Sequence, residues 1–246
     1  MIRLLEANGL SKSFGGLKAV NQLDFHLERG EILGLIGPNG SGKTTLFNLV
    51  AGVFKPDSGK ISFEGKDITR AGSASICQMG IGRTFQITRP FPRLTVLDNV
   101  KLGRAYGGQP AKTLEQAQAE AEEILEFIGL NTKRLIMAGS IGLMDRKRLE
   151  LGKALATRPK VLLLDEIMGG LNPTEIQAAM KLIRQIRDAG ISLIVVEHVM
   201  KAILGLSERV IVLNVGRKIA EGSPKEVIQD KQVIEAYLGV DQNVER

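Results

Sequence analysis

The 246-residue sequence has few aromatic residues and almost no cysteine: there are no Trp, two Tyr and one Cys. So few aromatic rings argue against a surface that binds nucleic acid by stacking its bases. The single cysteine, Cys77, excludes a disulfide bond within the chain and is typical of a reducing compartment. We expect it to be a small buried hydrophobic residue. The two histidines are far apart in the sequence and lack the spacing of metal ligands.

Long hydrophobic runs are missing as well. No stretch reaches the ~18 apolar residues of a membrane-spanning helix, and residues 1–6 lack the apolar stretch of a signal peptide. We therefore expect any role at a membrane to depend on a partner protein. The net charge of +6 suits anionic ligands such as nucleotide phosphates, acidic lipids or nucleic acid, and it is equally typical of a solvated basic surface.

The sequence does contain an alternation of short apolar runs and helix-like segments. Four runs are apolar enough for strands of a buried parallel sheet, at residues 31–36, 160–164, 191–196 and 210–213. Residues 23–27 and 60–63 favour shorter strands between Gly, Pro and Asp turns. Asn172 and Ser223 each precede a Pro and lie three residues before a Glu, which predicts a capped helix start at both. The pattern predicts an α/β fold with a helical insertion near residues 89–154.

The insertion contains a clear helix signal at residues 113–128. Thr113 and Gln116 form a capping-box pattern, apolar residues recur at helical spacing, and Gly129 follows where the helix is expected to end. The opposite face carries acidic residues that we expect to be solvated, namely Glu115, Glu120, Glu122, Glu123 and Glu126. A further helix is expected over residues 147–156.

The strand at residues 31–36 leads into a glycine-rich loop that fits G-x-x-x-x-G-K-[ST] at every position. The loop consists of Gly37, Pro38, Asn39, Gly40, Ser41, Gly42, Lys43 and Thr44, and a helix is expected from Thr45. Glycines let backbone N–H groups point at phosphate oxygens, and the helix adds the positive end of its dipole. Lys43 supplies a cation for the β- and γ-phosphates, and Thr44 a hydroxyl ligand for Mg²⁺. The motif predicts an ATP-binding protein; a chance glycine-rich turn is the alternative.

Two carboxylates end the apolar run at residues 160–164. The carboxyl edge of a parallel sheet is where α/β folds bind ligands, so we expect Asp165 to hold Mg²⁺ through water and Glu166 to act as general base on the attacking water. A solvated acidic turn is the alternative. His198 follows the next apolar strand and is predicted to hydrogen-bond the γ-phosphate; a purely structural histidine is its alternative.

Together these motifs resemble the ATPase subunits of ABC transporters, and the resemblance covers essentially the whole chain. Phe14 matches the aromatic residue that stacks on adenine in this family, although an ordinary core phenylalanine would look the same. Gln86 matches the glutamine that joins the nucleotide-binding core to the helical subdomain and senses Mg²⁺ and water. His198 matches the switch histidine. The loop that contacts the opposite subunit in this family matches Gly170, Leu171 and Asn172.

Within the family, the sequence is most similar to the ATPases that import branched-chain amino acids. The strings that carry this similarity are Arg-Thr-Phe-Gln at 83–86, Gly-Leu-Asn-Pro at 170–173, Glu-His at 197–198, and Val-Ile-Glu-Ala-Tyr-Leu-Gly at 233–239. The phosphate loop alone does not separate such subfamilies, whereas these longer strings do.

The resemblance implies a P-loop NTPase core with an antiparallel β subdomain and an inserted helical subdomain. The expected boundaries are residues 1–88 and 155–246 for the two parts of the nucleotide-binding core and 89–154 for the helical signature subdomain. The implied cofactors are ATP and Mg²⁺. The implied nucleotide-binding residues are Phe14 and the stretch from Gly37 to Thr45, the Mg²⁺ ligands are Thr44, Gln86 and (through water) Asp165, and the catalytic residues are Glu166, His198 and Gln86.

The family resemblance also implies partners and a location. Two ATPase subunits sandwich ATP, close, and pull on integral membrane permease subunits through the surface near Gln86. A periplasmic binding protein is an indirect partner, and nucleic acid is not expected to be one. The chain is therefore expected on the cytoplasmic face of the inner membrane as a peripheral protein.

One segment departs from the family pattern. The signature Leu-Ser-Gly-Gly-Gln aligns without gaps with residues 141–145, where Gly142 replaces the serine, Met144 replaces the second glycine, and Asp145 is the last residue. Because this segment grips the γ-phosphate bound to the other subunit, Met144 puts a side chain where close backbone approach is needed. A register at 139–143 recovers a serine and a glycine but needs two extra residues before the helix. We therefore hypothesise that a non-identical ATPase subunit supplies an intact signature. A second departure, Ile167 in place of a proline, is expected to have little consequence.

Three functions compete. The chain is favoured to be an importer ATPase for branched-chain or other hydrophobic amino acids. An ABC ATPase for another cargo, such as urea, aromatic acids or lipopolysaccharide, is the second reading. A soluble ABC ATPase acting on DNA or ribosomes is the third, but that class usually shows paired cassettes or a long coiled-coil insertion, which this sequence lacks.

Overall fold

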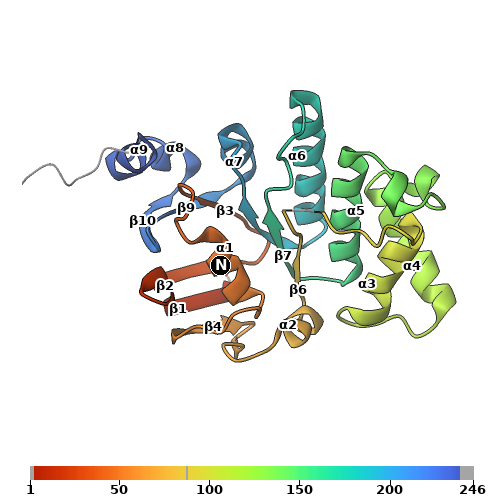
Figure 1. Ribbon diagram of the computed structural model, residues 1–246, viewed down its shortest axis with the longest axis horizontal. Helices are drawn as coiled ribbons and strands as arrows, with labels where there is room; N and C mark the ends of the chain where they lie inside the picture. The colour runs from red at the N-terminus through yellow and green to blue at the C-terminus, as the bar shows by residue number, and fades with distance from the viewer. Residues whose placement is uncertain (1–2, 87, 239–246) are drawn as a thin grey trace, which may run out of the picture. The chain divides into compact units, whose positions relative to one another are not determined.

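The structure is a computed structural model that describes residues 3–86 and 88–238 (Figure 1). The chain divides into two compact units. The first unit contains the residues up to Ala71 and those from Ser192 onward, and the second contains Gly72–Ile191. The motifs predicted from the sequence are therefore distributed over both units.

The first unit contains an antiparallel sheet with the strand order β2-β1-β4-β5. Its strands are β1 (Arg3–Phe14), β2 (Leu17–Glu28), β4 (Ser58–Phe63) and β5 (Lys66–Asp67). The strands predicted at residues 23–27 and 60–63 are confirmed as parts of β2 and β4, while β1 and β5 were not predicted. Apolar residues of β1 and β2, such as Leu5, Leu10 and Leu23, are fully buried, as expected for a sheet with one face on the core.

The same unit contains a mostly parallel sheet with the order β10-β9-β3-β8. Its strands are β3 (Ile32–Ile36), β8 (Ser192–Val196), β9 (Arg209–Asn214) and β10 (Arg217–Gly222). β3 runs parallel to both β8 and β9, and all residues of β3 and β8 are buried. The helices of this unit are α1 (Lys43–Val50), α7 (Met200–Leu206), α8 (Pro224–Val227) and α9 (Lys231–Leu238), with α8 and α9 beside β10 (Figure 1).

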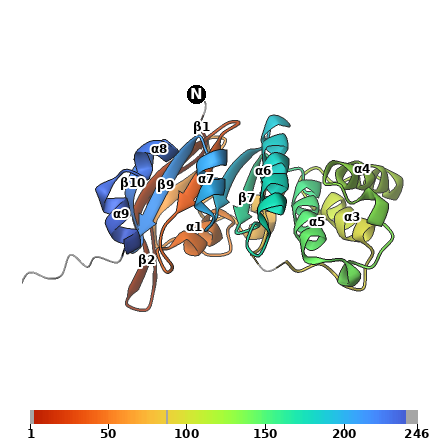
Figure 2. The same cartoon turned by 90° about the horizontal axis from the view of Figure 1, so that it is seen from above.

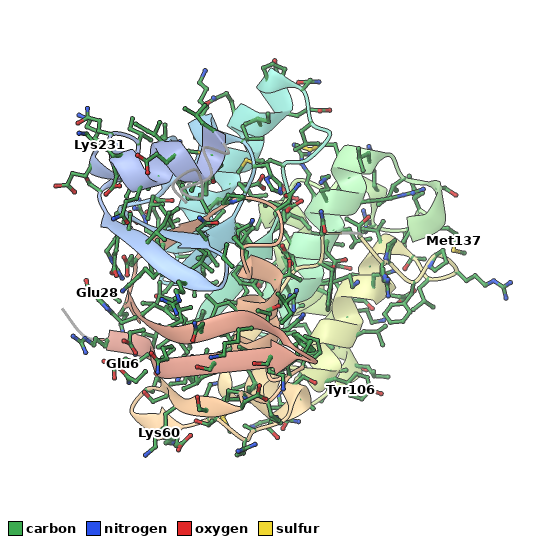
Figure 3. All side chains as sticks on the ribbon, turned by 60° about the vertical axis from the view of Figure 1, so that its left-hand side comes forward. Glu6, Glu28, Lys60, Tyr106, Met137 and Lys231 are labelled. Carbon is green, nitrogen blue, oxygen red and sulfur yellow. The ribbon has the colours of Figure 1, made fainter. Side chains whose placement is uncertain are left out.

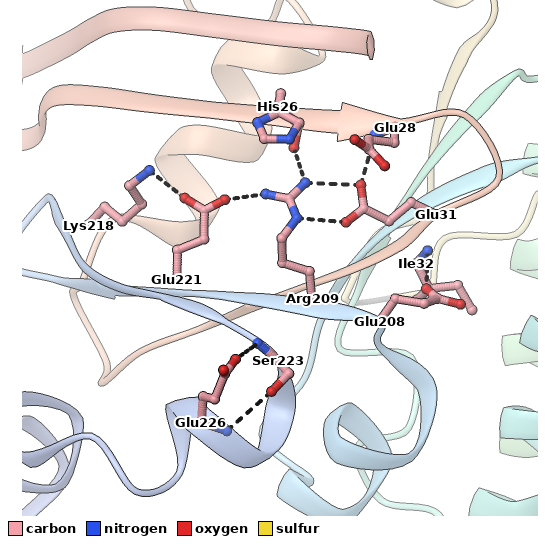
Figure 4. A network of polar contacts seen from close by, with 10 residues as sticks. All are labelled: His26, Glu28, Glu31, Ile32, Glu208, Arg209, Lys218, Glu221, Ser223 and Glu226. Atoms are coloured by element: carbon pink, nitrogen blue, oxygen red, sulfur yellow. Dashed lines mark hydrogen bonds and ion pairs between the residues drawn. The ribbon is translucent and has the colours of Figure 1, made fainter. Parts of the chain in front are cut away.

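A polar network around Arg209 ties the strands together at the amino end of β3 (Figure 4). The guanidinium donates to both carboxylate oxygens of Glu31 at 2.9 and 3.0 Å and to the backbone oxygen of His26 at 2.8 Å. It also pairs with Glu221 of β10. The network joins β2, β9 and β10 to Glu31, the residue before β3. It lies at the end of the sheet opposite to the phosphate loop, which follows the carboxyl end of β3.

The second unit combines a short parallel strand pair with a group of helices. The pair is β6 (Ile81–Arg83) and β7 (Val161–Asp165). The helices are α2 (Ser73–Met79), α3 (Val96–Tyr106), α4 (Leu114–Phe127), α5 (Leu143–Ala156) and α6 (Pro173–Asp188), with 3₁₀ turns at Asn131–Lys133 and Ala138–Ser140. Helices α3, α4 and α5 pack side by side (Figure 2).

The helix signals read from the sequence are confirmed, with shifts at the ends. Thr113 caps α4 by accepting from the backbone N–H of Gln116, and Gly129 follows the helix in the left-handed conformation with φ 71°. Asn172 and Ser223 both form complete capping boxes. α5 begins at Leu143, four residues before the predicted start.

The acidic face of α4 is not wholly solvated, which corrects our expectation for Glu120. Its carboxylate pairs with Arg104 of α3, which is 1% exposed, and with Arg158 at 2.7 Å. Burial raises the pKa of Glu120, but hydrogen bonds from Gln116 and Arg104 and the charges of both arginines outweigh it, so the net pKa is below the ordinary value. Glu120 thus holds α4 on α3.

Cys77 was expected to be buried, but the structure shows it only half-buried. This partial burial raises the pKa of its thiol. No helix in the described part of the chain is both long and apolar enough to cross a membrane.

Candidate nucleotide site

The phosphate loop follows β3 and runs into α1, as the motif predicts. Gly42 has φ 106° and ψ 0°, a conformation that side chains rarely adopt. A Cβ atom at this position would lie 2.3 Å from the backbone oxygen of Ala19 in β2. The loop therefore needs glycine here both for its backbone conformation and for its close approach to β2.

The end of the loop and the start of α1 contain hydrogen-bond donors that suit an anion. Gly42 is the N-cap of α1, and no side chain caps this end of the helix, so the first backbone N–H groups of α1 have no intrahelical acceptor. Lys43 is only 7% exposed, and its ammonium donates to the backbone oxygens of Gly37 at 2.7 Å and Pro38 at 3.0 Å. A helix N-terminus with uncapped N–H groups and an adjacent lysine fits a phosphate group.

Neighbouring segments hold the loop in place. The N–H of Gly216, in the turn between β9 and β10, donates to the backbone oxygen of Ser41 at 3.0 Å, and its own backbone oxygen accepts from Asn21 of β2 at 2.8 Å. Tyr237 of α9 lies against the start of the loop. Burial raises the pKa of its hydroxyl above the ordinary value, although the hydrogen bond with the N–H of Gly37 acts to lower it. The sequence analysis missed Gly216 and Tyr237; the Val-Gly turn at 215–216 was the available signal for the first.

Phe14 and His198 belong to the same unit as the loop. Phe14 is the last residue of β1, lies opposite Leu17 in the hairpin, and is 44% exposed. His198 is exposed and follows β8, which is the parallel neighbour of β3. Because parallel strands end at the same edge, His198 and the phosphate loop share the carboxyl edge of the sheet.

The second unit brings the predicted carboxylates and Gln86 together. Asp165 ends β7, Glu166 follows it, and Gln86 follows β6, the parallel partner of β7. The amide nitrogen Nε2 of Gln86 donates to Oε2 of Glu166 at 2.5 Å. The side chain of Asp165 pairs with Arg83 at 3.0 Å, and its backbone N–H donates to the Thr84 hydroxyl at 3.2 Å. These contacts connect the end of β7 to the end of β6.

Glu166 has an unusual backbone. Its φ is 49°, in the left-handed region that residues other than glycine rarely occupy. Such conformations persist where the surrounding structure enforces them, and they gather at functional sites. The turn after β7 thereby directs the half-buried Glu166 side chain to Gln86.

The signature segment and the predicted dimer-contact loop also lie in the second unit. Gly142 is the N-cap of α5, Met144 is half-buried in its first turn, and Asp145 is ion-paired with Lys133 at 2.5 Å. Gly170 is left-handed with φ 76°, and Asn172 caps α6. The structure thus places the phosphate loop, Phe14 and His198 in one unit, and Gln86, the two carboxylates, the signature and this loop in the other.

Comparison with known proteins identifies the family. Residues 20–169 match the family model described as ABC transporter, and residues 217–242 match the one described as branched-chain amino acid ATP-binding cassette transporter. The chain therefore belongs to the ABC transporter family, as one of its ATP-binding cassettes. ATPases of this family power transport, dimerise and work with membrane permease subunits.

Individual relatives cover nearly the whole chain. The high-affinity branched-chain amino acid transport ATP-binding protein LivG of Salmonella typhimurium is 38% identical over 96% of this chain and 98% of its own. The lipopolysaccharide export system ATP-binding protein LptB of Haemophilus influenzae is 34% identical, over 96% and 97%. A solved nucleotide-free cassette from an ABC transporter is similar with a TM-score of 0.89 and 32% identity, over 96% of this chain and 99% of that one. The ADP conformation of the cassette MJ1267 is similar to the same degree.

Proposed function

We propose that this chain is the ATP-hydrolysing subunit of an importer for branched-chain or other hydrophobic amino acids. The assignment of the cargo rests on the match of residues 217–242 to the branched-chain transporter model, and the LivG relatives support it. As a peripheral subunit on the cytoplasmic face of the inner membrane, it drives permeases that receive the amino acid from a periplasmic binding protein.

Nucleotide binding is assigned to the first unit. The uncapped N–H groups at the start of α1 and the Lys43 ammonium take the β- and γ-phosphates. Residues Gly37 to Thr45 line the phosphates, and Phe14 stacks on the adenine. Lys43 exchanges its present bonds to the oxygens of Gly37 and Pro38 for charge-assisted bonds to phosphate, which are stronger.

Mg²⁺ is assigned to Thr44, Gln86 and, through water, Asp165. Hydroxyl, amide and carboxylate oxygens are the ligands that Mg²⁺ prefers, and few protein ligands suffice because nucleotide phosphates and waters complete its shell. When bound, the ion neutralises charge that develops on the phosphates.

Hydrolysis is assigned to Glu166, with Gln86 and His198. Glu166 orients and deprotonates the attacking water, and the Gln86 amide holds the carboxylate through the 2.5 Å hydrogen bond seen here. His198, at the same sheet edge as the phosphate loop, donates to the γ-phosphate. Catalysis of this kind is mainly positioning and charge stabilisation.

The permease contact is assigned to apolar side chains that follow β6. Phe85 and Phe91 are both about half exposed. Met137, which is labelled in Figure 3, is also about half exposed. Phe91 is held in place, because its N–H donates to Asn99 Oδ1 at 2.8 Å and Lys153 lies 5.7 Å from its ring centroid. Since this segment directly flanks Gln86, movement of a permease is transmitted to the residue that holds Glu166.

The working dimer is proposed to contain a second, non-identical ATPase subunit. The first turn of α5 exposes no serine hydroxyl, and it places the Met144 side chain where the family needs close backbone approach to a γ-phosphate. Restoring the signature with Gly142→Ser, Leu143→Gly, Met144→Gly and Asp145→Gln in a Glu166→Gln background is expected to create ATP-dependent homodimers in light scattering. Glu166→Gln alone should stay monomeric, and equal dimerisation of both would contradict the proposal.

Affinity purification of the tagged chain from membranes of its source cell tests the proposed function. We expect two permease subunits and a second ATPase to co-purify. Recovery of DNA or ribosomes without membrane subunits would overturn the transporter reading.

Export of lipopolysaccharide is the second candidate, because LptB is nearly as similar as LivG. The purified complex distinguishes the two cargoes. Stimulation of its ATPase by a leucine-loaded binding protein supports import, whereas stimulation by lipopolysaccharide alone supports export.

A further inference from the structure

Phe14 is held by two neighbouring side chains although it is 44% exposed. The ring of Phe54 packs edge-on against it, with centroids 5.2 Å apart and an interplanar angle of 68°. The Lys12 ammonium lies 5.6 Å from the Phe14 centroid. Such edge-to-face and cation–π contacts restrain a ring while leaving other parts of its surface open.

The backbone next to Phe14 is held by Asp57. One carboxylate oxygen of Asp57 accepts from the N–H of Ser13 at 2.7 Å, and the other accepts from the Lys12 ammonium at 2.7 Å. The N–H of Asp57 donates to the backbone oxygen of Ser11 at 2.9 Å. The hydrogen bonds from Lys12 and Ser13 hold the pKa of Asp57 below its ordinary value. One side chain thus fixes the last residues of β1 before Phe14, and charge-assisted bonds of this type are the stronger ones.

The same hairpin is fixed to the phosphate loop. Phe14 lies opposite Leu17 and Ser13 opposite Lys18. The next residue along β2, Ala19, makes the 2.3 Å approach to the Cβ position of Gly42. The ring of Phe14 is therefore a few residues from the loop along one hairpin, so the orientation of the ring relative to the phosphates depends on how firmly the end of β1 is held.

We propose that Asp57 and Phe54 are positioning residues that hold the Phe14 ring ready to stack on the nucleotide base. The proposal rests on the assignment of Phe14 in the proposed function. An exposed aromatic residue at a strand end otherwise loses rotamer freedom when a base binds, and ordering one such side chain weakens binding by about two- to tenfold. Asp57 and Phe54 remove this loss by ordering the ring before the nucleotide arrives.

The test compares the affinities of the full chain for ATP and for inorganic triphosphate. Triphosphate occupies the phosphate loop but has no base. The ratio of the dissociation constant for ATP to that for triphosphate therefore isolates the contribution of the Phe14 ring. We expect Asp57→Ala and Phe54→Leu to weaken ATP binding by about two- to tenfold and to leave triphosphate binding unchanged. Asp67→Ala is the matched control: Asp67 also holds a local turn, by accepting from the N–H of Thr69 at 2.8 Å, but it has no contact with Phe14, and the ratio should not change.

The outcomes separate this inference from the proposed function. If Phe14→Ala leaves this ratio unchanged, Phe14 does not stack on the base. The proposed adenine-stacking role of Phe14 and the positioning role of Asp57 and Phe54 would then both fail. If Phe14→Ala raises the dissociation constant for ATP relative to that for triphosphate but Asp57→Asn and Phe54→Leu do not, the positioning role alone is overturned. An equal loss of ATP and triphosphate binding in the Asp57 variants would also overturn it, because the effect would then lie in the phosphate loop. The conservative Asp57→Asn, which keeps the size of the side chain, carries the test if Asp57→Ala does not fold.

Discussion

Replacing Gly42 by alanine is expected to damage the phosphate loop more than replacing Gly40. Both residues have positive φ, 106° and 76°, so both substitutions force alanine into a disfavoured conformation at a cost of roughly 1 to 3 kcal/mol. The surroundings differ. The new Cβ at Gly42 would lie 2.3 Å from the Ala19 oxygen, whereas at Gly40 no atom lies within 4 Å.

The additional strain at Gly42 sets the size of the difference. Forcing a methyl group into an occupied space costs about 1 to 3 kcal/mol, because either the loop or the β2 strand must move. If the loop moves, the N–H groups at the start of α1 no longer converge on a phosphate. We therefore expect Gly42→Ala to weaken ATP binding at least about fivefold more than Gly40→Ala, since 1.4 kcal/mol corresponds to tenfold.

The assay is titration of each purified variant with a fluorescent ATP analogue, together with urea unfolding of the free protein. Urea unfolding shows whether the strain is relieved by local movement or by loss of stability. Equal affinities and equal stabilities of the two variants would refute the reasoning, because they would mean that the contact between the loop and β2 does not constrain the loop.

Two other changes are predicted to have effects of known direction. Glu166→Gln should retain ATP binding and lower turnover by at least about a hundredfold, and turnover that persists would show that the general base is another group. Glu120→Ala should lower the free energy of unfolding by about 2 to 3 kcal/mol, because buried Arg104 loses a charged partner, while the exposed Glu123→Ala should change it little. Since the pKa of folded Glu120 is lowered, this stabilisation is complete above the ordinary glutamate pKa and declines as the pH falls through the pKa of the folded state. Urea unfolding of wild type and Glu120→Ala at several pH values measures this change in stability. A stability difference that does not depend on pH would contradict the ion-pair explanation.

The sequence predicts well what depends on neighbouring residues. The phosphate loop, the buried strands and the caps at Asn172 and Ser223 are set by local spacing, and the structure contains each of them. The association of Gln86 with Glu166 follows from two parallel strands that end at one edge, together with the family resemblance. Such features need no knowledge of the packing of distant segments.

Features that depend on distant segments were not predicted. Glu120 looked like one of several solvated glutamates, because its partner Arg104 lies on another helix. The support of the phosphate loop by Gly216 and Ala19 requires the register of β2 and β10 against the loop. The left-handed backbone of Glu166 has no sequence signal, because a glutamate gives no indication of positive φ.

Amino acid uptake tests the central claim most directly. The complex that co-purifies with this chain would be reconstituted in proteoliposomes with a leucine-binding protein inside and ATP supplied to the face that carries the ATPase, and movement of labelled leucine would be followed. The account predicts leucine transport that requires ATP, is lost with Glu166→Gln, and persists with the Asp67→Ala control. Leucine transport that continues with Glu166→Gln, or ATP hydrolysis without any leucine transport in the wild type, would contradict the account.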